Sequence, residues 1–351
     1  MAFRAVLFTI VAFLQQAPAA PTPPPQPFDE WLNGVRAEAL TRGIRESTLD
    51  QALTGLQPLP VVVERDRTQA ELVLTLDRYL KQHLTKKVID AAAAKRRAHA
   101  AVLKKVEQQY GVPPEVVVAI WGLESNFGRF SGVRPTIQTL ATLAYDPRRS
   151  AMFREELFDA LTILDNGDVE PSEMRGSWAG ALGQPQFMPS SFLLYAQDFD
   201  GDGRRDIWRS APDVFASIAN FLHAKGWSSG GRWGREVTVP SSVLARLAEV
   251  APPQTEGCLA RRQMSVPLPV ETWKKLGVRL PGGSPLPAAD SDVAAASLIS
   301  GVKRHFLVYP NYQAILEYNC VNAYALSVGV LADRSLKPPA KAPAHKSKKR
   351  T

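Results

Sequence analysis

Gly122-Leu123-Glu124-Ser125-Asn126-Phe127-Gly128 is the stretch of this chain that decides the fold. The residues before it are apolar on almost every side, and Pro113 and Pro114 precede them. Proline suits the first turn of a helix, so the pattern predicts a helix from Glu115 to about Ser125. A helix without a polar face belongs in a protein core.

Glu124 follows Ile120, Trp121 and Leu123 and precedes Phe127, so we expect a poorly solvated carboxyl group. Desolvation disfavours the carboxylate form and raises the pKa. A carboxyl group that stays protonated near neutral pH can act as a general acid toward a glycosidic oxygen. A glutamate at a helix end can also accept a hydrogen bond from a nearby backbone N–H, and this residue alone does not decide between the two roles.

A second stretch, Gly176 to Ser191, combines small residues with amide and hydroxyl groups. Ser177 and Gln186 offer uncharged donors and acceptors that suit the amides and hydroxyls of sugars. The small residues that allow close backbone approach to a ligand are Ala179, Gly180, Ala181 and Gly183. By itself, this composition also fits a tight crossing of two helices.

The segment from Asp198 to Asp206 has the spacing of the front part of an EF-hand loop. Oxygen ligands stand at its first, third, fifth and ninth positions, and glycine stands at the sixth: Asp198, Asp200, Asp202, Asp206 and Gly203. Arg209 occupies the twelfth position, and Asp213 lies just beyond it. Calcium is the hard cation that accepts such a ligand set. An Asp- and Gly-rich turn held by side-chain-to-backbone hydrogen bonds is the alternative.

The two ends of the chain differ in character from the rest. Residues 1–19 combine Arg4, an apolar run at 5–14 and small residues at 17–20, which predicts a secretory signal peptide. The apolar run is too short for a permanent membrane span. The cleavage region has no cysteine that could carry a lipid, so we expect a soluble, exported, periplasmic protein.

The formal charge of +8 comes almost entirely from the ends of the chain. Arg4 contributes one positive charge, and the basic residues of the C-terminal tail are Lys337, Lys341, Lys346, Lys348, Lys349 and Arg350. The remainder is nearly neutral, which argues against a nucleic-acid-binding domain. The tail is expected to be disordered, and either it is simply solvated or it contacts an anionic cell-wall or membrane surface.

The rest of the sequence has a mainly helical pattern, except for one segment whose composition favours strands. Helices are predicted at 28–56, 65–110, 150–165, 189–197, 212–225 and 314–332. Residues 226–287 are rich in Gly, Pro, Val and Thr, and 235–240 and 265–268 are predicted to be strands. Cys258 and Cys320 could form a disulfide in an exported protein or remain two separate thiols.

Taken together, the motif around Glu124 and the segment 176–191 resemble the lytic murein transglycosylases, specifically the membrane-bound lytic transglycosylase B family. The acidic loop, Tyr318-Asn319 and Tyr324-Ala325-Leu326 follow in the order that family shows. The resemblance covers 28–333 and implies cleavage of the β-1,4 bond between N-acetylmuramic acid and N-acetylglucosamine of peptidoglycan glycan strands.

The resemblance also implies residue roles and an α+β, mainly α fold. Glu124 is the implied catalytic residue, and the implied substrate contacts are Ser177, Gln186, Tyr318 and Asn319. Tyr145 and Phe187 are further candidates for stacking on sugars. The ligands expected for a structural calcium ion are Asp198, Asp200, Asp202, the carbonyl of Arg204, Asp206 and Asp213. No organic cofactor is expected.

The implied organisation has a lysozyme-like core with additions. The expected segments are a signal peptide (1–19), a Pro-rich linker (20–27), a helical domain (28–110), a catalytic core with the EF-hand-like loop (111–230), a small β-containing insertion (231–287), C-terminal helices that complete the core (288–335) and a basic tail (336–351). The oligomeric state is left open by the sequence.

A hydrolase that cuts glycosidic bonds normally uses two carboxylates. No second acid stands out beside Glu124, although Asp146 and Glu173 are conceivable. The leading hypothesis is therefore a transglycosylase in which Glu124 is the single acid and base and the product ends in 1,6-anhydromuramic acid. A hydrolytic muramidase on the same scaffold and a non-catalytic peptidoglycan-binding protein are the alternatives.

Overall fold

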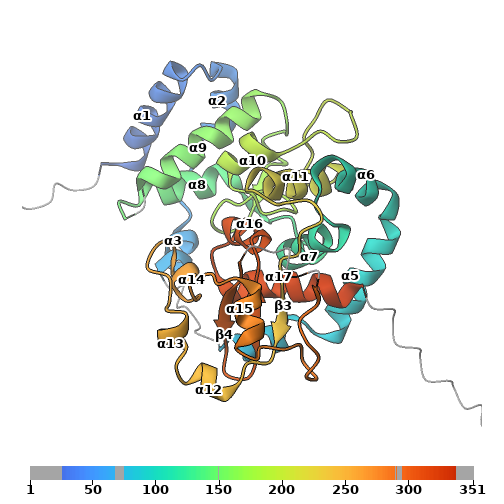
Figure 1. Cartoon of the computed structure of the whole chain (residues 1–351). Helices are drawn as coiled ribbons and strands as arrows, with labels where there is room; N and C mark the ends of the chain where they lie inside the picture. The colour runs from blue at the N-terminus through green and yellow to red at the C-terminus, as the bar shows by residue number, and fades with distance from the viewer. Residues whose placement is uncertain (1–25, 68–74, 149, 289, 291–294, 337–351) are drawn as a thin grey trace, which may run out of the picture.

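The computed structural model describes residues 26–67, 75–148, 150–288, 290 and 295–336, and it is mainly helical (Figure 1). The predicted signal peptide lies outside the described residues, as do most of the linker and nearly all of the basic tail. The helices before the Glu124 motif are α1 (Phe28–Thr41), α2 (Glu46–Leu53), α3 (Pro60–Arg67), α4 (Leu76–His83), α5 (Lys86–Ala98) and α6 (Ala100–Tyr110).

Helix α7 (Pro114–Ser125) is the predicted buried helix, and it lies at the centre of the main hydrophobic core. Its side chains from Val117 to Ile120 have no exposed surface. Helices α5, α6, α11 (Ala211–Ala224) and α17 (Asn322–Ser335) pack around it. The end of α7, which carries Glu124, is therefore held by elements from distant parts of the sequence.

The helices after α7 match several predicted ranges closely. They are α8 (Thr136–Tyr145), α9 (Ser150–Asp165), α10 (Pro189–Tyr195) and α16 (Asn311–Tyr318), together with α11 and α17. The single helix predicted at 314–332 is in fact α16 and α17, separated by an extended connection at 319–321. This break places Tyr318 at the end of one helix and Tyr324 at the start of the next.

The helices of the segment 28–110 pack against later helices in two groups. Helices α1 and α2 pack with α8 and α9, whereas α5 and α6 pack with α7. Buried residues of both halves belong to the same hydrophobic cluster as α7 and α17. The N-terminal helices therefore complete the core that contains the Glu124 motif.

Two small antiparallel sheets accompany the helices. Strands β1 (Arg134–Pro135) and β2 (Arg175–Gly176) form a short ladder near the segment 176–191. Strands β3 (Gly234–Val237), β5 (His305–Val308) and β4 (Ser297–Ser300) form a second sheet in that order, with His305 of the central strand opposite both Val237 and Ser300. The predicted strand at 235–240 is present as β3.

The boundary predicted at 287 for the β-containing insertion is corrected by this sheet. Two of its strands, β4 and β5, lie in the segment 288–335, where only helices were expected. The segment 265–268 contributes isolated bridges at Ser265 and Leu268 rather than a continuous strand. The β part of the chain therefore extends to Val308.

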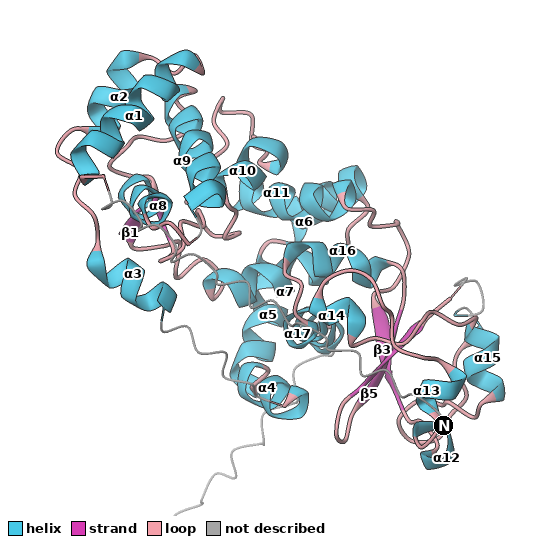
Figure 2. Ribbon diagram, turned by 90° about the vertical axis from the view of Figure 1, so that its left-hand side faces the viewer, coloured by secondary structure: helices cyan, strands magenta, loops and turns pink. Residues whose placement is uncertain are grey.

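The short helices α12 (Ser241–Leu244), α13 (Leu247–Val250) and α15 (Val270–Lys275) form a second, smaller core with this sheet. Helix α14 (Leu259–Arg262) instead contributes Ala260 to the main core. Trp273 of α15 is fully buried in the second core. Figure 2 shows α12, α13 and α15 beside the sheet, at the opposite end of the molecule from α1 and α2. Within the described ranges, no helix has the length and apolar character needed to cross a membrane.

Candidate active site

The end of α7 is a sharp turn that fixes the Glu124 side chain. Asn126, Phe127 and Gly128 have positive φ angles of 51°, 59° and 79°. The Ser125 hydroxyl donates to the carbonyl of Trp121 (2.8 Å) and accepts a hydrogen bond from the N–H of Gly128 (3.0 Å). Glycine tolerates a positive φ, but for Asn126 and Phe127 the left-handed region is unfavourable, so the surrounding packing maintains their conformation.

The glycine at the start of the motif makes room for this turn. The Phe127 ring folds back against α7, and a Cβ atom at Gly122 would lie 2.5 Å from a carbon of that ring. The Phe127 ring is buried and also packs edge-on against Trp121. The absence of a side chain at Gly122 therefore allows the Phe127 ring to pack against the end of α7, directly after Glu124 and Ser125.

Glu124 is partly buried, and its carboxyl group has one strong hydrogen-bond donor. The Tyr324 hydroxyl, on α17, donates to Oε1 of Glu124 at 2.5 Å. Burial raises the pKa of Glu124 to about 7, although the hydrogen bond from Tyr324 acts in the opposite direction. A carboxyl group with this pKa exists in both protonation states near neutral pH, as an acid–base catalyst requires.

Tyr79 and Tyr318 lie close enough to Glu124 to sense its charge. Burial and the negative charge of Glu124 raise the pKa of Tyr79, on α4, and hold the pKa of Tyr318, at the end of α16, well above its usual range. Together with Tyr324, which bonds the carboxyl group directly, these phenols come from three helices. Tyr324 and Tyr79 had no predicted site role, because nothing local in the sequence indicates that they approach residue 124.

Residues 176–187 form a compact turn that is connected to this tyrosine cluster. The Tyr318 hydroxyl donates to the carbonyl of Pro185 at 2.7 Å. Gln184 accepts a hydrogen bond from the indole N–H of Trp121 (2.6 Å) and donates to the carbonyl of Trp208 (2.7 Å). Gln184 is buried, so it links the turn to α7. Gln184 is not among the residues that the sequence pattern predicts for the site.

The predicted substrate contacts Ser177 and Gln186 make hydrogen bonds within the turn itself. The Ser177 hydroxyl accepts from the N–H groups of Ala179 (3.3 Å) and Ala181 (3.1 Å). Gln186 has a φ of 55° and donates from its amide to the carbonyl of Gly183 at 2.7 Å. Both side chains are partly exposed and keep further hydrogen-bonding capacity.

Asn319 is exposed at the end of α16, beside Tyr318. The two aromatic candidates for stacking pack against other aromatic rings. Tyr145 packs against Phe28 and Trp31 of α1. Phe187 is 2% exposed and packs between other aromatic rings in the core.

The conceivable second carboxylates have partners of their own. Asp146 accepts hydrogen bonds from Arg148, and Glu173 pairs with Arg209. Among the described residues, the pKa of Glu124 is shifted by burial and by the hydrogen bond from Tyr324, and not by a neighbouring carboxylate.

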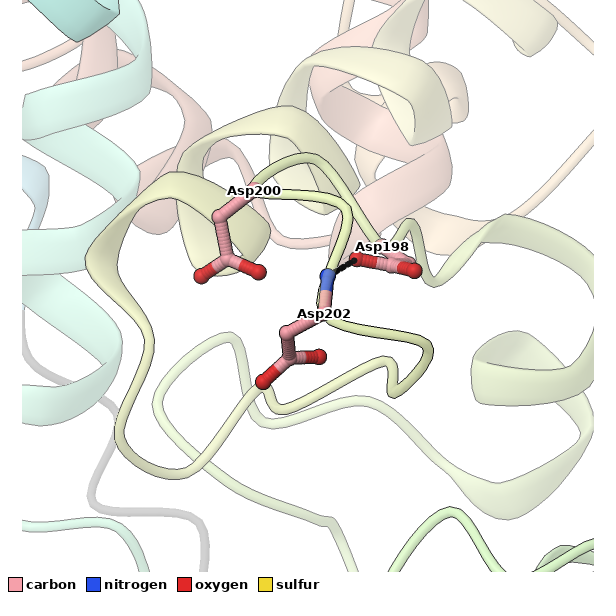
Figure 3. Close-up of side chains that lie close together, drawn as sticks. All are labelled: Asp198, Asp200 and Asp202. Atoms are coloured by element: carbon pink, nitrogen blue, oxygen red, sulfur yellow. Dashed lines mark hydrogen bonds between the residues drawn. The ribbon is translucent and has the colours of Figure 1, made fainter.

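The acidic loop brings three carboxylates together (Figure 3). Ligand atoms of Asp198, Asp200 and Asp202 all lie within 4.8 Å of one another, and the three side chains are exposed. Asp198 also accepts hydrogen bonds from three backbone N–H groups of the loop, those of Gly201, Asp202 and Gly203. A cluster of carboxylate oxygens is the donor set that hard cations such as calcium prefer.

Asp213 and Asp206, the other predicted carboxylate ligands, organise the backbone of the loop. Asp213 has no exposed surface and accepts from the N–H groups of Phe199 (2.8 Å), Asp200 (3.3 Å) and Asp206 (2.9 Å). Asp206 accepts from the N–H groups of Trp208 and Arg209. The N–H of Arg204, whose carbonyl is a predicted ligand, donates to Asp202.

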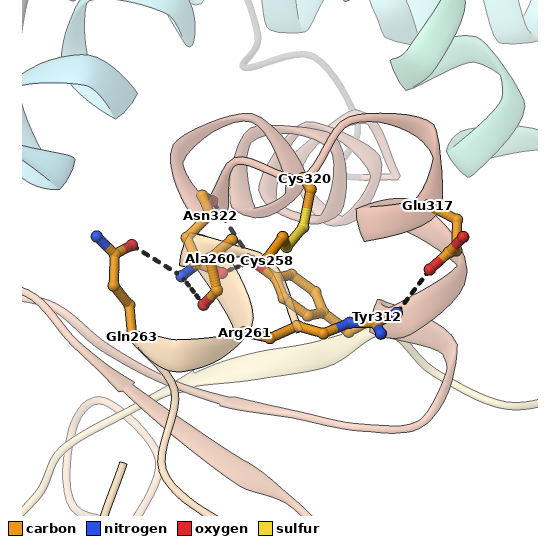
Figure 4. Close-up of a disulfide and its surroundings, with 8 residues drawn as sticks. All are labelled: Cys258, Ala260, Arg261, Gln263, Tyr312, Glu317, Cys320 and Asn322. Atoms are coloured by element: carbon orange, nitrogen blue, oxygen red, sulfur yellow. Dashed lines mark hydrogen bonds and ion pairs between the residues drawn. A yellow bond between two sulfur atoms is a disulfide. The ribbon is translucent and has the colours of Figure 1, made fainter. Parts of the chain in front are cut away.

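The two cysteines, which the sequence left either paired or free, form the Cys258–Cys320 disulfide (Figure 4). Their Cα atoms are 6.6 Å apart, and 62 positions separate them in the sequence. The disulfide joins the start of α14 to the connection between α16 and α17. Cys320 therefore lies between Tyr318 and Tyr324 along the chain.

The core is mainly helical and carries, at a helix end, a partly buried glutamate that accepts a hydrogen bond from a tyrosine. This arrangement agrees with the lysozyme-like core that the resemblance implied. The model of the transglycosylase SLT domain family matches residues 27–333, and the chain belongs to this family. The resemblance to the membrane-bound lytic transglycosylase B family and the predicted α+β, mainly α fold are thereby confirmed.

Several known proteins are similar to this chain. Membrane-bound lytic murein transglycosylase B of Escherichia coli (strain K12) is 38% identical over 154 residues, which are 44% of this chain and 42% of that protein. The match therefore spans less than half of the curated relative.

Solved structures match over a larger part of the chain. SltB3 from Pseudomonas aeruginosa, in complex with NAG-anhNAM-pentapeptide, is 43% identical with a TM-score of 0.80, covering 88% of this chain and 79% of SltB3. Escherichia coli Slt35, in complex with calcium, is 27% identical with a TM-score of 0.70, covering 87% of this chain and 92% of Slt35.

Proposed function

We propose that this protein is a lytic transglycosylase that cleaves the β-1,4 bond between N-acetylmuramic acid and N-acetylglucosamine in peptidoglycan and leaves a 1,6-anhydromuramic acid end. One observation carries the proposal: a single carboxyl group, Glu124, with a pKa of about 7 and a tyrosine hydroxyl on its Oε1. The complexes of SltB3 with NAG-anhNAM-pentapeptide and NAG-NAM-pentapeptide support it.

The proposed reaction uses Glu124 twice. Protonated Glu124 gives its proton to the glycosidic oxygen as the bond to C1 of the muramic acid breaks, and the N-acetyl group of the substrate stabilises the positive charge that develops at C1. The resulting carboxylate then takes the proton of the C6 hydroxyl, whose oxygen bonds to C1. Glu124 ends protonated, and no water is consumed.

The remaining residues are proposed to hold the substrate and to tune Glu124. Tyr324 holds the carboxyl group in one orientation through its hydrogen bond. Ser177, Gln186, Tyr318 and Asn319 are proposed to contact the sugars, since Tyr318 connects the turn 176–187 to the neighbourhood of Glu124. We further propose that the protein is exported to the periplasm and that its basic tail is available to anionic surfaces.

Mass spectrometry of the soluble products released from purified peptidoglycan tests the proposed reaction. We expect muropeptides that end in anhydromuramic acid and are one water lighter than hydrolysed products. Ordinary reducing ends would instead identify a hydrolytic muramidase. If the oxidised wild-type chain binds peptidoglycan but releases no fragments, it is a binding protein and the proposal is wrong.

The pH dependence of cleavage is a second expected result. The first step needs protonated Glu124, whose pKa is about 7, so kcat/KM is expected to fall about tenfold for each pH unit above 7. The Tyr324 hydrogen bond lowers the pKa of Glu124, so Tyr324→Phe should move this decline to higher pH. Initial rates on a soluble muropeptide between pH 5 and 9 measure both. A decline centred near the ordinary glutamate value of about 4.3 would contradict the assignment.

We also propose that the acidic loop binds a structural calcium ion, held by Asp198, Asp200 and Asp202 with the carbonyl of Arg204 and further oxygens from Asp206 or Asp213. Bound calcium would neutralise the three clustered carboxylates, which otherwise repel one another. Slt35 in complex with calcium supports this assignment.

Removal of calcium is expected to lower the melting temperature by about 5 °C or more, because a ligand that binds only the folded state stabilises it. Calorimetry in calcium and in EDTA measures the difference. An Asp202→Ala variant should lose most of the calcium response and provides the control. An identical melting temperature in calcium and EDTA for the wild-type protein would exclude the proposed site.

A further inference from the structure

The connection between α16 and α17 controls where two of the tyrosines near Glu124 are placed. It consists of residues 319–321, with Tyr318 directly before it and Tyr324 three residues after it. Its backbone is extended, with φ of −153° at Asn319 and −130° at Val321. Asn319 and Val321 are exposed, so packing does little to fix this segment.

The first turn of α17 begins without the usual side-chain cap. Val321 is the N-cap residue, and valine has no side-chain oxygen to accept the free N–H groups at a helix start. Helix α17 packs against α4, α5, α7 and α16. In its first turn, Asn322 and Tyr324 are each 7% exposed, and contacts of this turn with α14 add to the packing.

Helix α14 supplies contacts to both sides of this connection (Figure 4). The Cys258–Cys320 disulfide joins the residue before α14 to the middle of the connection. The Asn322 side chain, 7% exposed, donates to the carbonyl of Ala260 at 2.7 Å. Arg261 of α14 forms an ion pair with Glu317 at 2.6 Å.

The connected groups form one network with the core. The Tyr312 hydroxyl, fully buried, donates to Oδ1 of Asn322 at 3.0 Å, and the Asn322 amide also approaches Oε1 of Gln263 at 3.3 Å. Asn322 is thus bonded on one side to α16 and on the other to α14. We call the disulfide, the Asn322–Ala260 hydrogen bond and the Arg261–Glu317 ion pair the α14 brace.

We propose that the α14 brace is a positioning device for catalysis: it holds the start of α17 so that the Tyr324 hydroxyl stays on Glu124. This inference rests on the proposed function. Hydrogen bonds weaken steeply beyond about 3.2 Å, so a shift of the first turn of α17 by about 1 Å removes the contact. A misplacement of that size in a catalytic group can lower the rate by up to about 10²-fold.

The central experiment combines the double variant Cys258→Ala/Cys320→Ala with Tyr324→Phe. The double variant is expected to lower kcat about tenfold with KM changed less than about twofold, since it alters the catalytic group more than the sugar contacts. It should also raise the pKa of Glu124, in the same direction as Tyr324→Phe, because both weaken the same hydrogen bond. Adding Tyr324→Phe to the double variant should then change little, because residues that act through one contact are not additive.

The pKa of Glu124 can be followed without substrate by ¹³C NMR of the carboxyl carbon, assigned with Glu124→Gln. This readout stays informative even if the wild-type chain releases no peptidoglycan fragments, an outcome that would overturn the proposed function only. Val243→Ala, in the second core, is the matched control. It should lower the melting temperature as the cysteine variant does and leave the pKa and kcat unchanged.

Two results would overturn the brace. One is a pKa of Glu124 that stays the same or falls in the folded cysteine variant. The other is a triple variant whose loss of kcat equals the product of the separate losses, which would show that the disulfide and Tyr324 act independently. A rise in the pKa together with non-additive rates supports the proposal.

Discussion

Glu124→Gln is expected to lower the rate of glycan cleavage by about 10³-fold while leaving the fold intact. Glutamine has nearly the same shape as glutamic acid and can still accept the Tyr324 hydrogen bond, but it cannot give a proton to the leaving oxygen or take one from the C6 hydroxyl. Because the proposed mechanism assigns both proton transfers to one residue, one substitution removes both. Release of soluble fragments from peptidoglycan measures the effect.

Glu115→Gln is the matched control for this experiment. Glu115 lies on the same helix, and burial also raises the pKa of its carboxyl group, but it stands in the first turn of α7, at the end opposite Glu124. We expect Glu115→Gln to retain nearly full activity. Persistent lysis by Glu124→Gln at more than about a tenth of the wild-type rate would falsify the catalytic assignment.

The same substitution should make the protein more stable at alkaline pH. The pKa of Glu124 is raised in the folded state, so its contribution to stability is fully present below the unfolded pKa of about 4.3 and is lost as pH rises through about 7. Above pH 7 the folded protein contains a poorly solvated carboxylate, which glutamine avoids. The full shift from about 4.3 to about 7 corresponds to about 3–4 kcal/mol, and partial solvation of Glu124 reduces it. We therefore expect Glu124→Gln to increase the free energy of unfolding by about 1–3 kcal/mol at pH 8 and to have almost no effect at pH 4.

The motif that contains Glu124 could be recognised in the sequence because the motif itself is local. The apolar helix before it and the turn after it lie within about fifteen residues, and helix periodicity and turn residues describe such segments well. The same is true of the acidic loop, whose ligands follow one another at alternate positions. Short-range patterns thus identified the central features of both candidate sites.

Tyr324, Tyr79 and Gln184 could not be found in this way. Tyr324 stands 200 residues from Glu124 in the sequence, and Gln184 stands 63 residues from Trp121. Their roles come from the packing of α17 and α4 and from the turn 176–187, which no local pattern encodes. Within that turn, composition favoured Gln186, but burial selects Gln184 as the link to α7.

The β4–β5–β3 sheet likewise could not be predicted fully from local sequence patterns. Strands β4 and β5 are each four residues long, and β5 lies between β3 and β4 and pairs with both. β3 pairs with β5, which lies about 70 positions later, whereas β4 and β5 follow one another in the sequence and pair as a hairpin. The pairing that joins β3 to this hairpin is therefore a long-range contact. The β part was therefore predicted from composition, and its end was placed too early.

Asp213→Ala is the second substitution with a large expected effect, in this case on stability. The fully buried carboxylate accepts three backbone N–H groups from both ends of the acidic loop, at Phe199, Asp200 and Asp206. Alanine leaves these donors without that partner, and each buried donor left unsatisfied costs about 1–3 kcal/mol. Because parts of the loop can be reached by water, we expect a total loss of about 2–4 kcal/mol in the free energy of unfolding, measured by urea denaturation.

EDTA separates the two roles that Asp213 can have. If Asp213 organises the loop backbone, Asp213→Ala destabilises the protein equally in calcium and in EDTA. Asp202→Ala is the contrasting variant, because Asp202 is exposed and lies in the carboxylate cluster, so its effect should disappear in EDTA. A loss in Asp213→Ala that also disappears in EDTA would mean that Asp213 acts only through the metal. Equal losses would instead show that the loop is built before calcium binds, so that the ion meets a preformed group of ligands.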